Sequence, residues 1–307
     1  MSIKVAIVGG AGRVGSNAAY ALQCGGIVRD IALVDVNHDA AQGEALDLLH
    51  GSSIIADQRI HAANLSEVAD ADVVCITAGS RRKPDESRLD LINRNVSIFR
   101  GILDGLRDGG LSRDAILFVV SNPVDVLTRL AVEYLDWNPQ RVMGLGTVLD
   151  TARFRSMIAE AKNLPPTQVK ALILGEHGDS MSPIWSSATV GGIALTELLT
   201  PNEQQTIFER TKGSGAEVIR RKGGAGYAVG LSILEVIHSI ALDSRQILPV
   251  STRMSGQYGL QRVCLSIPTV VGREGVVGYH DIKLWPKELA GLQRSSQSLD
   301  QTFAQLK

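Results

Sequence analysis

The 307-residue sequence is poor in several features that are typical of particular classes of protein. Aromatic residues make up only 4% of it, so few side chains are available for stacking on nucleic-acid bases. The 31 basic residues are balanced by 32 acidic ones, without a basic tract or an acidic tail. Nucleic acid and anionic membranes are therefore poor predictions for a partner. No apolar run approaches the ~18 residues that a membrane span needs.

Cysteine is also scarce, and the three present, Cys24, Cys75 and Cys264, lie far apart. They lack the spacing of a zinc or redox motif, so no metal site is predicted, and buried free thiols in a reducing cytoplasm are favoured. The sequence begins with Met1 and Ser2 and enters a predicted strand at Ile3, so we expect no signal peptide. We therefore expect a cytoplasmic protein, and the length suggests roughly two domains.

A glycine-rich turn near the N-terminus predicts a dinucleotide site. The apolar run 3–8 predicts a parallel strand covered on both faces, and a helix is predicted over 16–22. Between them lie Gly9, Gly10, Ala11, Gly12, Arg13, Val14 and Gly15. A second predicted strand, 31–36, contains Asp35, which comes 20 residues after Gly15. This order matches the dinucleotide fingerprint, in which the pyrophosphate rests on the helix N-terminus.

Asp35 favours NAD over NADP, because its carboxylate can bind the adenosine ribose and would repel a 2′-phosphate. The turn itself fits two patterns. Starting at Gly10 it is G-x-G-x-x-G, and starting at Gly9 it is G-x-x-G-x-x-G. The sequence leaves open which of the two glycines begins the phosphate turn.

Further strands are predicted over 72–78 and 115–121, and polar residues or glycine lie at the carboxyl end of each. The first ends in Thr77, Ala78 and Gly79, and the second leads through Val120 into Asn122 and Pro123. A doubly wound sheet places its ligand crevice at such strand ends. Between the two strands a loop with four cations in residues 80–88 precedes a predicted helix, 89–106, that carries Asn95. The loop is a candidate lid for an anionic substrate, although a solvated charged loop has the same composition.

The second half contains a histidine in a position suited to proton transfer. A predicted buried strand, 169–174, ends at Gly175, and His177 follows between two acids. Asp150 and Arg153 are three residues apart on a predicted helix and so share one face. By themselves these residues also fit a surface histidine and a local salt bridge. Helices are further predicted over 201–222, 227–243 and 286–306, with an antiparallel hairpin sheet within 247–277.

Seven stretches together resemble the L-lactate and L-malate dehydrogenases over almost the whole chain. They are residues 9–15, 43–48, 76–79, 88–95, 121–125, 149–155 and 175–180. The resemblance implies an α/β fold, with a Rossmann doubly wound parallel sheet in residues 1–146. A mixed α/β substrate domain with an antiparallel sheet follows in residues 147–307. It also implies reversible hydride transfer between NAD and a 2-hydroxy acid, in a homo-oligomer for which a tetramer is favoured over a dimer.

Roles for single residues are carried over from the family by matching position. His177 resembles the proton donor and acceptor, and Asp150 resembles its partner. Arg153 resembles the clamp on the substrate carboxylate, and Arg88 the lid arginine that polarises the ketone. Asn122 resembles a ligand of substrate and cofactor, with a cis bond to the following proline. The implied NAD contacts are Gly9, Gly10, Ala11, Gly12, Arg13, Val14, Gly15, Asp35, Thr77, Ala78, Gly79, Asn95, Val120 and Asn122.

Two positions divide the family by substrate. Malate enzymes resemble one another in having arginine six residues before the lid arginine, and Arg82 stands there. Ala225 matches a position where lactate enzymes carry threonine. Both predict an NAD-dependent malate dehydrogenase of the tricarboxylic acid cycle, with a dicarboxylate substrate. Residues 175–180 look more lactate-like, so L-lactate dehydrogenase is the alternative, followed by a non-catalytic NAD-binding protein.

A regulatory site is a further hypothesis. Arg155 and Lys170 match positions that form an anion site between subunits in some family members. Two solvated surface cations would fit the sequence equally well.

Overall fold

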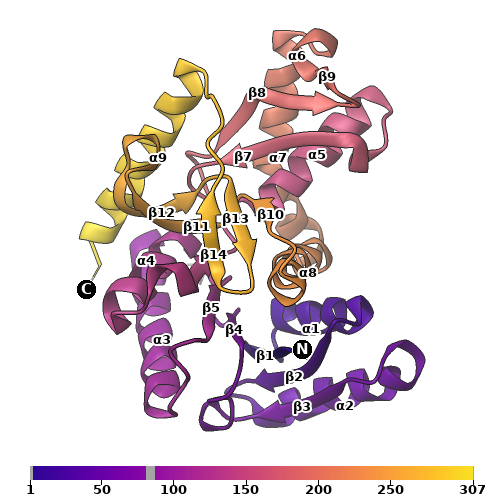
Figure 1. Ribbon diagram of the computed structural model, residues 1–307, viewed down its shortest axis with the longest axis vertical. Helices are drawn as coiled ribbons and strands as arrows, with labels where there is room; N and C mark the ends of the chain where they lie inside the picture. Colours follow the sequence, from indigo (N-terminus) through magenta and orange to yellow (C-terminus); the bar gives the residue numbers. More distant parts are fainter. Residues whose placement is uncertain (1–2, 81–86, 307) are drawn as a thin grey trace.

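The computed structural model describes residues 3–80 and 87–306, and its main feature is an eight-stranded sheet (Figure 1). The strand order is β12–β11–β6–β5–β4–β1–β2–β3. The first six strands along the chain pair in parallel. They are β1 (Ile3–Val8), β2 (Val28–Val34), β3 (Arg59–Ala63), β4 (Val73–Ile76), β5 (Ile116–Val119) and β6 (Val142–Gly144). Because the order reverses at β1, the ligand crevice is expected beside the carboxyl ends of β1 and β4.

Helices cover both faces of this sheet, which explains why its central strands are apolar throughout. Val5 and Ile7 of β1 join one buried cluster, and the alternate residues Ala6 and Val8 join another. The first cluster includes residues of α1 (Arg13–Gly25), α2 (His38–Ile55) and α8 (Tyr227–Leu242). The second includes residues of α3 (Arg88–Asp108) and α4 (Val124–Leu135). The predicted doubly wound α/β fold is therefore confirmed.

The predicted hairpin sheet in 247–277 is divided between two sheets. Strands β11 (Ser251–Ser255) and β12 (Gln261–Ser266) extend the main sheet, because Ser251 pairs antiparallel with Gly144 of β6. A separate three-stranded sheet holds β10 (Gln246–Leu248), β13 (Thr269–Gly272) and β14 (Gly275–Tyr279). Another holds β7 (Val169–Leu174), β8 (Ser182–Val190) and β9 (Ile193–Ala194).

The remaining helices surround the β7–β8 sheet. They are α5 (Val148–Lys162), α6 (Leu195–Leu198), α7 (Pro201–Lys222) and the C-terminal α9 (Pro286–Ala304). Short 3₁₀ turns occur at η1 (Leu65–Glu67), η2 (Pro139–Arg141), η3 (Pro166–Gln168) and η4 (Gln257–Gly259). In Figure 1, α9 lies on the left and the β7–β8 sheet on the upper right, both above the parallel strands.

Two expectations from composition can be compared with this structure. Cys75 and Cys264 are buried, as predicted, but Cys24 is exposed because it lies on the outer side of α1. Within the ranges 3–80 and 87–306, no helix is both long and apolar enough to cross a membrane.

Candidate active site

Strand β7 is followed by Gly175, where the chain turns and approaches the first turn of α5. The φ of Gly175, 91°, is left-handed, and an added Cβ would lie 2.5 Å from Oγ of Ser295, so only glycine fits. The turn that follows places His177 against the first turn of α5. Nδ1 of His177 lies 2.5 Å from Oδ2 of Asp150, and Nη1 of Arg153 donates to Oδ1 of Asp150 at 3.0 Å. The three residues predicted for proton transfer and carboxylate binding are thus brought together.

The surroundings of this cluster favour a charged histidine. The Asp150 side chain is only 1% exposed, whereas that of His177 is 24% exposed. Burial lowers the pKa of His177, but the charges of Asp150 and Asp125 and the bond to Asp150 raise it overall. Burial raises the pKa of Asp150, while His177 and Arg153 more than offset this and lower it. With Nδ1 occupied by Asp150, Nε2 is the ring atom left to exchange a proton with a ligand.

A second buried carboxylate lies behind the histidine. The backbone N–H of His177 donates to Oδ2 of Asp125 at 2.7 Å. Asp125 is only 2% exposed, and burial raises its pKa to about 6. No role was predicted for Asp125 from the sequence. Its signal was present, however, because it is a charged residue in the otherwise apolar stretch 124–127, and a charged residue is rarely buried unless it is paired.

The carboxyl ends of β4 and β5 are tied together at the expected crevice. The Asn122–Pro123 peptide bond is cis, as predicted. The side chain of Asn95, which is 6% exposed, donates to the carbonyl of Asn122 at 3.0 Å. The same side chain accepts from the N–H of Ser80 at 2.8 Å. Ser121 donates to the carbonyl of Ala78 at 2.5 Å. Residues 77–79 and 120–122 therefore form one rim of the site.

The glycine turn completes this rim with geometry that suits a pyrophosphate. Gly9 has a φ of 89°, and an added Cβ would lie 2.7 Å from the Ala78 nitrogen. At Gly15 it would lie 2.2 Å from the Gly9 oxygen. Gly12 caps α1 without a side-chain hydrogen bond, so amides of the first turn remain for a ligand. Asp35, directly after β2, accepts from the N–H of Ala11 at 3.1 Å and lies where a ribose is expected. These residues fit a dinucleotide.

Other predicted residues lie elsewhere or are not described. Arg82 lies outside the described residues, and Arg88 is described only as the first residue of α3. The Arg13 side chain turns from the glycine turn to the end of α7, where Nη1 donates to the carbonyls of Lys222 at 2.6 Å and Gly224 at 3.1 Å.

Three further predicted positions lie in the second half of the chain. Ala225, at the junction of α7 and α8, packs against the first core cluster. Nε of Arg155 donates to the carbonyl of Ala171 at 2.9 Å, whereas the exposed Lys170 donates to the carbonyl of Thr167 at 3.4 Å.

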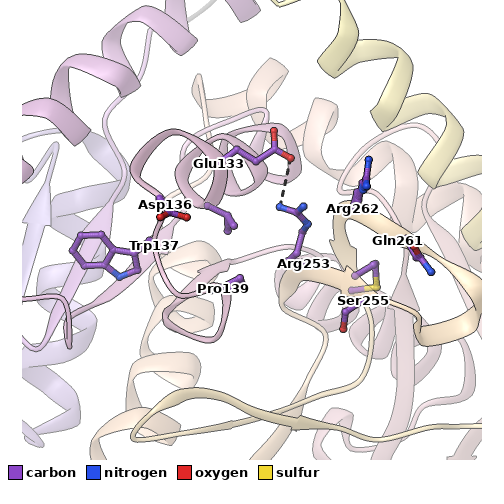
Figure 2. Close-up of a pocket in the computed structure, with 10 residues that line it drawn as sticks. Glu133, Asp136, Trp137, Pro139, Arg253, Ser255, Gln261 and Arg262 are labelled. Carbon is purple, nitrogen blue, oxygen red and sulfur yellow. Dashed lines mark ion pairs between the residues drawn. The ribbon is translucent and has the colours of Figure 1, made fainter.

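A cavity of about 620 Å³ lies at a different place, between α4, η2, β11 and β12 (Figure 2). Arg253 points toward Glu133 across it, with 3.4 Å between Nη1 and Oε1. It is lined by Val132, Glu133, Asp136, Trp137, Pro139, Arg253, Met254, Ser255, Gln261 and Arg262. None of the predicted site residues that the structure describes lines it, so this cavity is separate from the His177 cluster.

Comparisons with known proteins cover the whole chain. Residues 3–144 match the family model of the lactate/malate dehydrogenase NAD-binding domain. Residues 147–307 match that of the lactate/malate dehydrogenase α/β C-terminal domain. The L-lactate dehydrogenase of Gloeobacter violaceus is 41% identical over 98% of this chain and 92% of its own. That of Synechococcus sp. (strain JA-3-3Ab) is 39% identical over 96% of both.

Solved structures agree with these relatives. The minor L-lactate dehydrogenase of Enterococcus mundtii superimposes with a TM-score of 0.94 at 36% identity, over 100% of this chain and 99% of that one. A lactate dehydrogenase from a Medee basin deep-sea metagenome library gives 0.95 at 33% identity, over 99% of this chain and 98% of that one.

The substrate prediction is wrong in the light of these relatives, which carry the name lactate dehydrogenase. They overturn the prediction of a malate dehydrogenase of the tricarboxylic acid cycle with a dicarboxylate substrate, and they support the stated alternative. The prediction rested on two positions, Arg82 and Ala225, whereas the relatives match nearly every part of the chain.

Proposed function

The chain belongs to the lactate/malate dehydrogenase family, and from this we propose that it interconverts L-lactate and pyruvate with NAD. The names of its relatives support this substrate pair. The observation that carries the chemistry is the 2.5 Å contact between His177 and buried Asp150. Such a pair holds a proton on a histidine near neutral pH, which a ketone reduction requires.

When bound, NADH would supply the hydride to the substrate carbon in reduction, and NAD⁺ would accept it in oxidation. Nε2 of His177 gives its proton to the ketone oxygen during reduction and takes it back during oxidation. Asp150 stabilises the imidazolium. Arg153 uses only Nη1 for Asp150 in the structure, so other guanidinium N–H groups remain for the substrate carboxylate. Asn122 and Arg88 are proposed to bind the substrate and polarise its ketone.

The proposed NAD site follows the crevice at the switch point of the sheet. The pyrophosphate would rest on the turn 9–15, and Asp35 would bind the adenosine ribose. Residues 77–79, Asn95 and residues 120–122 would contact the nicotinamide side. The hydrogen bonds that join Asn95 to Ser80 and Asn122 support this arrangement, because they fix that rim before a ligand binds.

We further propose a homo-oligomer, with a tetramer favoured over a dimer. Helix α1 packs against both α2 and α8, and all three helices expose large apolar side chains. They are Tyr20, Leu46, Leu49, Ile54, Ile55, Tyr227, Leu231 and Leu242. Light scattering of the purified protein would measure the mass directly.

The division into domains at 146/147 and a cytoplasmic location stay predictions. The boundaries of the two family models support the division into domains.

The test of function is NADH oxidation with pyruvate and with oxaloacetate at matched concentrations. We expect the higher kcat/KM with pyruvate. His177→Asn serves as the control that the activity belongs to this site, and it should lose a factor of about 10²–10⁴. A preference for oxaloacetate, or activity that survives in His177→Asn, would overturn the proposal.

A further inference from the structure

Asp125 lies behind the turn that carries His177 and has an unusual environment for a carboxylate. It stands in the first turn of α4 among the buried residues Val124, Val126 and Leu127. Oδ2 accepts the N–H of His177 at 2.7 Å. Oδ1 is buried and makes no hydrogen bond of ordinary geometry among the described residues, although the hydroxyl of Ser251, which also has none, lies close enough to lower the pKa of Asp125. A buried carboxylate whose oxygens are incompletely hydrogen-bonded destabilises a fold, so its presence calls for a reason other than stability.

We propose that Asp125 is a positioning residue that fixes the His177 main chain and holds the proton on its ring through its negative charge, while destabilising the fold. The importance of that proton rests on the proposed function. A neutral asparagine could accept the same hydrogen bond from His177 through its Oδ1. What asparagine cannot supply is the charge, and this distinguishes the proposal from a purely structural role.

The groups that face Asp125 come from every side. Glu176 and His177 lie on the turn after β7, and β12 brings Cys264 into its electrostatic range. Strand β11 contributes the uncharged Ser251 and, two residues on, Arg253, which pairs with Glu133 of α4, whereas residues 142–144 of β6 include no charged side chain.

The His177 ring meets a further set of charges. On α5, Asp150 and Arg153 act on the ring, in opposite directions. Asp125 therefore adds to Asp150 in retaining the proton, and it opposes Arg153.

Burial raises the pKa of Asp125 from 3.8 to about 6, and Glu176 adds to this, while Ser251 and His177 oppose it. A carboxyl with a raised folded-state pKa contributes stability that is fully present below its ordinary pKa. That contribution is lost as the pH rises through the folded-state value. An asparagine side chain at this position would not ionise. The gain in stability of Asp125→Asn over the wild type should therefore grow as the pH rises from about 4 to about 6. It should reach up to about a hundredfold in the unfolding equilibrium constant.

The experiment compares the wild type with Asp125→Asn, and uses Asp57→Asn, in an exposed position before β3, as the matched loss of one charge. The Tm is measured at about pH 5 and about pH 8 at fixed protein concentration. The pKa of the His177 ring is measured by NMR, with the signal assigned by its absence in His177→Asn. The pH dependence of kcat/KM for pyruvate is recorded for the same proteins.

We expect Asp125→Asn to raise the Tm, and to raise it more at the higher pH. We expect the His177 pKa to fall by about one unit, the usual size of shifts caused by surrounding charges. The alkaline limb of kcat/KM should move to lower pH by the same amount. Asp57→Asn should change neither the ring pKa nor the pH profile.

Equal Tm differences at the two pH values, together with an unchanged ring pKa, would show that Asp125 is only a hydrogen-bond acceptor. A failure of Asp125→Asn to fold would also contradict the proposal, because the substitution is expected to stabilise. The Tm and the ring pKa require no turnover. If the wild type reduced no keto acid, the proposed function would fail while these two measurements still decided the role of Asp125.

Asp125→Ala tests the other half of the proposal, the fixing of the main chain. Alanine removes the acceptor of the His177 N–H as well as the charge. We expect kcat to fall further than in Asp125→Asn, with unchanged affinity for NADH. Equal kcat values in the two variants would contradict a positioning role.

Discussion

Asp150→Asn is the substitution that tests the catalytic cluster most directly. Asp150 is 1% exposed, and each of its oxygens is bound by a different cation, His177 at 2.5 Å and Arg153 at 3.0 Å. Asparagine keeps the shape and removes the charge. The two cations then repel each other without a carboxylate between them, in a site where water screens little.

The size of the effect follows from the charge pair. At ~4 Å and an effective dielectric constant near ~20, two unit charges attract by about 4 kcal/mol. One pKa unit corresponds to about 1.4 kcal/mol, so the pKa of His177 could fall by up to about three units. The ring would then be mostly neutral at about pH 7 and could not protonate a ketone. We expect kcat/KM for pyruvate to fall by about 10²–10⁴, the usual contribution of general acid catalysis.

The direction of the pH dependence is a stricter test than the size of the loss. Reduction requires protonated His177, so activity is present below its pKa and is lost as the pH rises through it. Because Asp150 raises that pKa, Asp150→Asn should move this limb to lower pH, and the loss should shrink in acid. Oxidation of lactate requires the neutral ring and should be impaired less. Glu160→Gln, an exposed change on the same helix, is the control.

Stability should change in the same variant, in a defined range of pH. The pKa of Asp150 is lowered, so its contribution is present above its ordinary pKa and is lost as the pH falls through the folded-state value. The pKa of His177 is raised, so its contribution is fully present below about 6.5 and is lost as the pH rises through the folded-state value. The Tm of Asp150→Asn should thus fall most between about pH 4 and about pH 6.5. Turnover within about threefold of the wild type, with the same pH profile, would refute the reasoning, since general acid catalysis is worth far more.

Three further predictions concern other parts of the chain. Asp35→Ser should raise the NADPH/NADH ratio of kcat/KM at least about tenfold, because the carboxylate that repels a 2′-phosphate is lost, and an unchanged ratio would contradict this. Arg13→Ala should lower the Tm by about 2–4 °C through the loss of its bonds to the end of α7, while the Kd for NADH stays nearly constant. If Arg155 and Lys170 form an anion site, phosphate should change the activity or the assembly of the wild type but not of Lys170→Ala.

The features that the sequence predicts well are local. The strand 169–174 and the helix 201–222 are observed with the predicted bounds, because an apolar run and a capped amphipathic stretch each depend on neighbours in the chain. The first helix begins at Arg13, three residues before the predicted start, because Gly12 serves as its N-cap without a capping side chain. Helix α4 was not predicted, although its sequence is amphipathic, with Asp125, Arg129 and Glu133 recurring every four residues among apolar ones.

Features that depend on distant residues were harder to predict. His177 meets Asp150 across 27 residues and Asp125 across 52. Only the resemblance to a family supplied the first pair, and nothing supplied the second. Likewise, a hairpin pattern in 247–277 fits any sheet. The single pairing of Ser251 with Gly144 decides that β11 and β12 extend the main one.

The substrate was hard to predict from the sequence for a different reason. The energy with which a cation attracts a carboxylate depends on its solvent exposure, which the identity of the residue does not reveal. An arginine that is buried against a carboxylate attracts it by about 4 kcal/mol before desolvation. The same pair in water contributes about 0–1 kcal/mol. Arg82 selects a second carboxylate only if it is held in a water-excluded site, whereas a solvated Arg82 is compatible with pyruvate as substrate. The ratio of kcat/KM for oxaloacetate and pyruvate in Arg82→Gln measures this difference. A ratio unchanged from the wild type means that Arg82 remains solvated when the substrate binds.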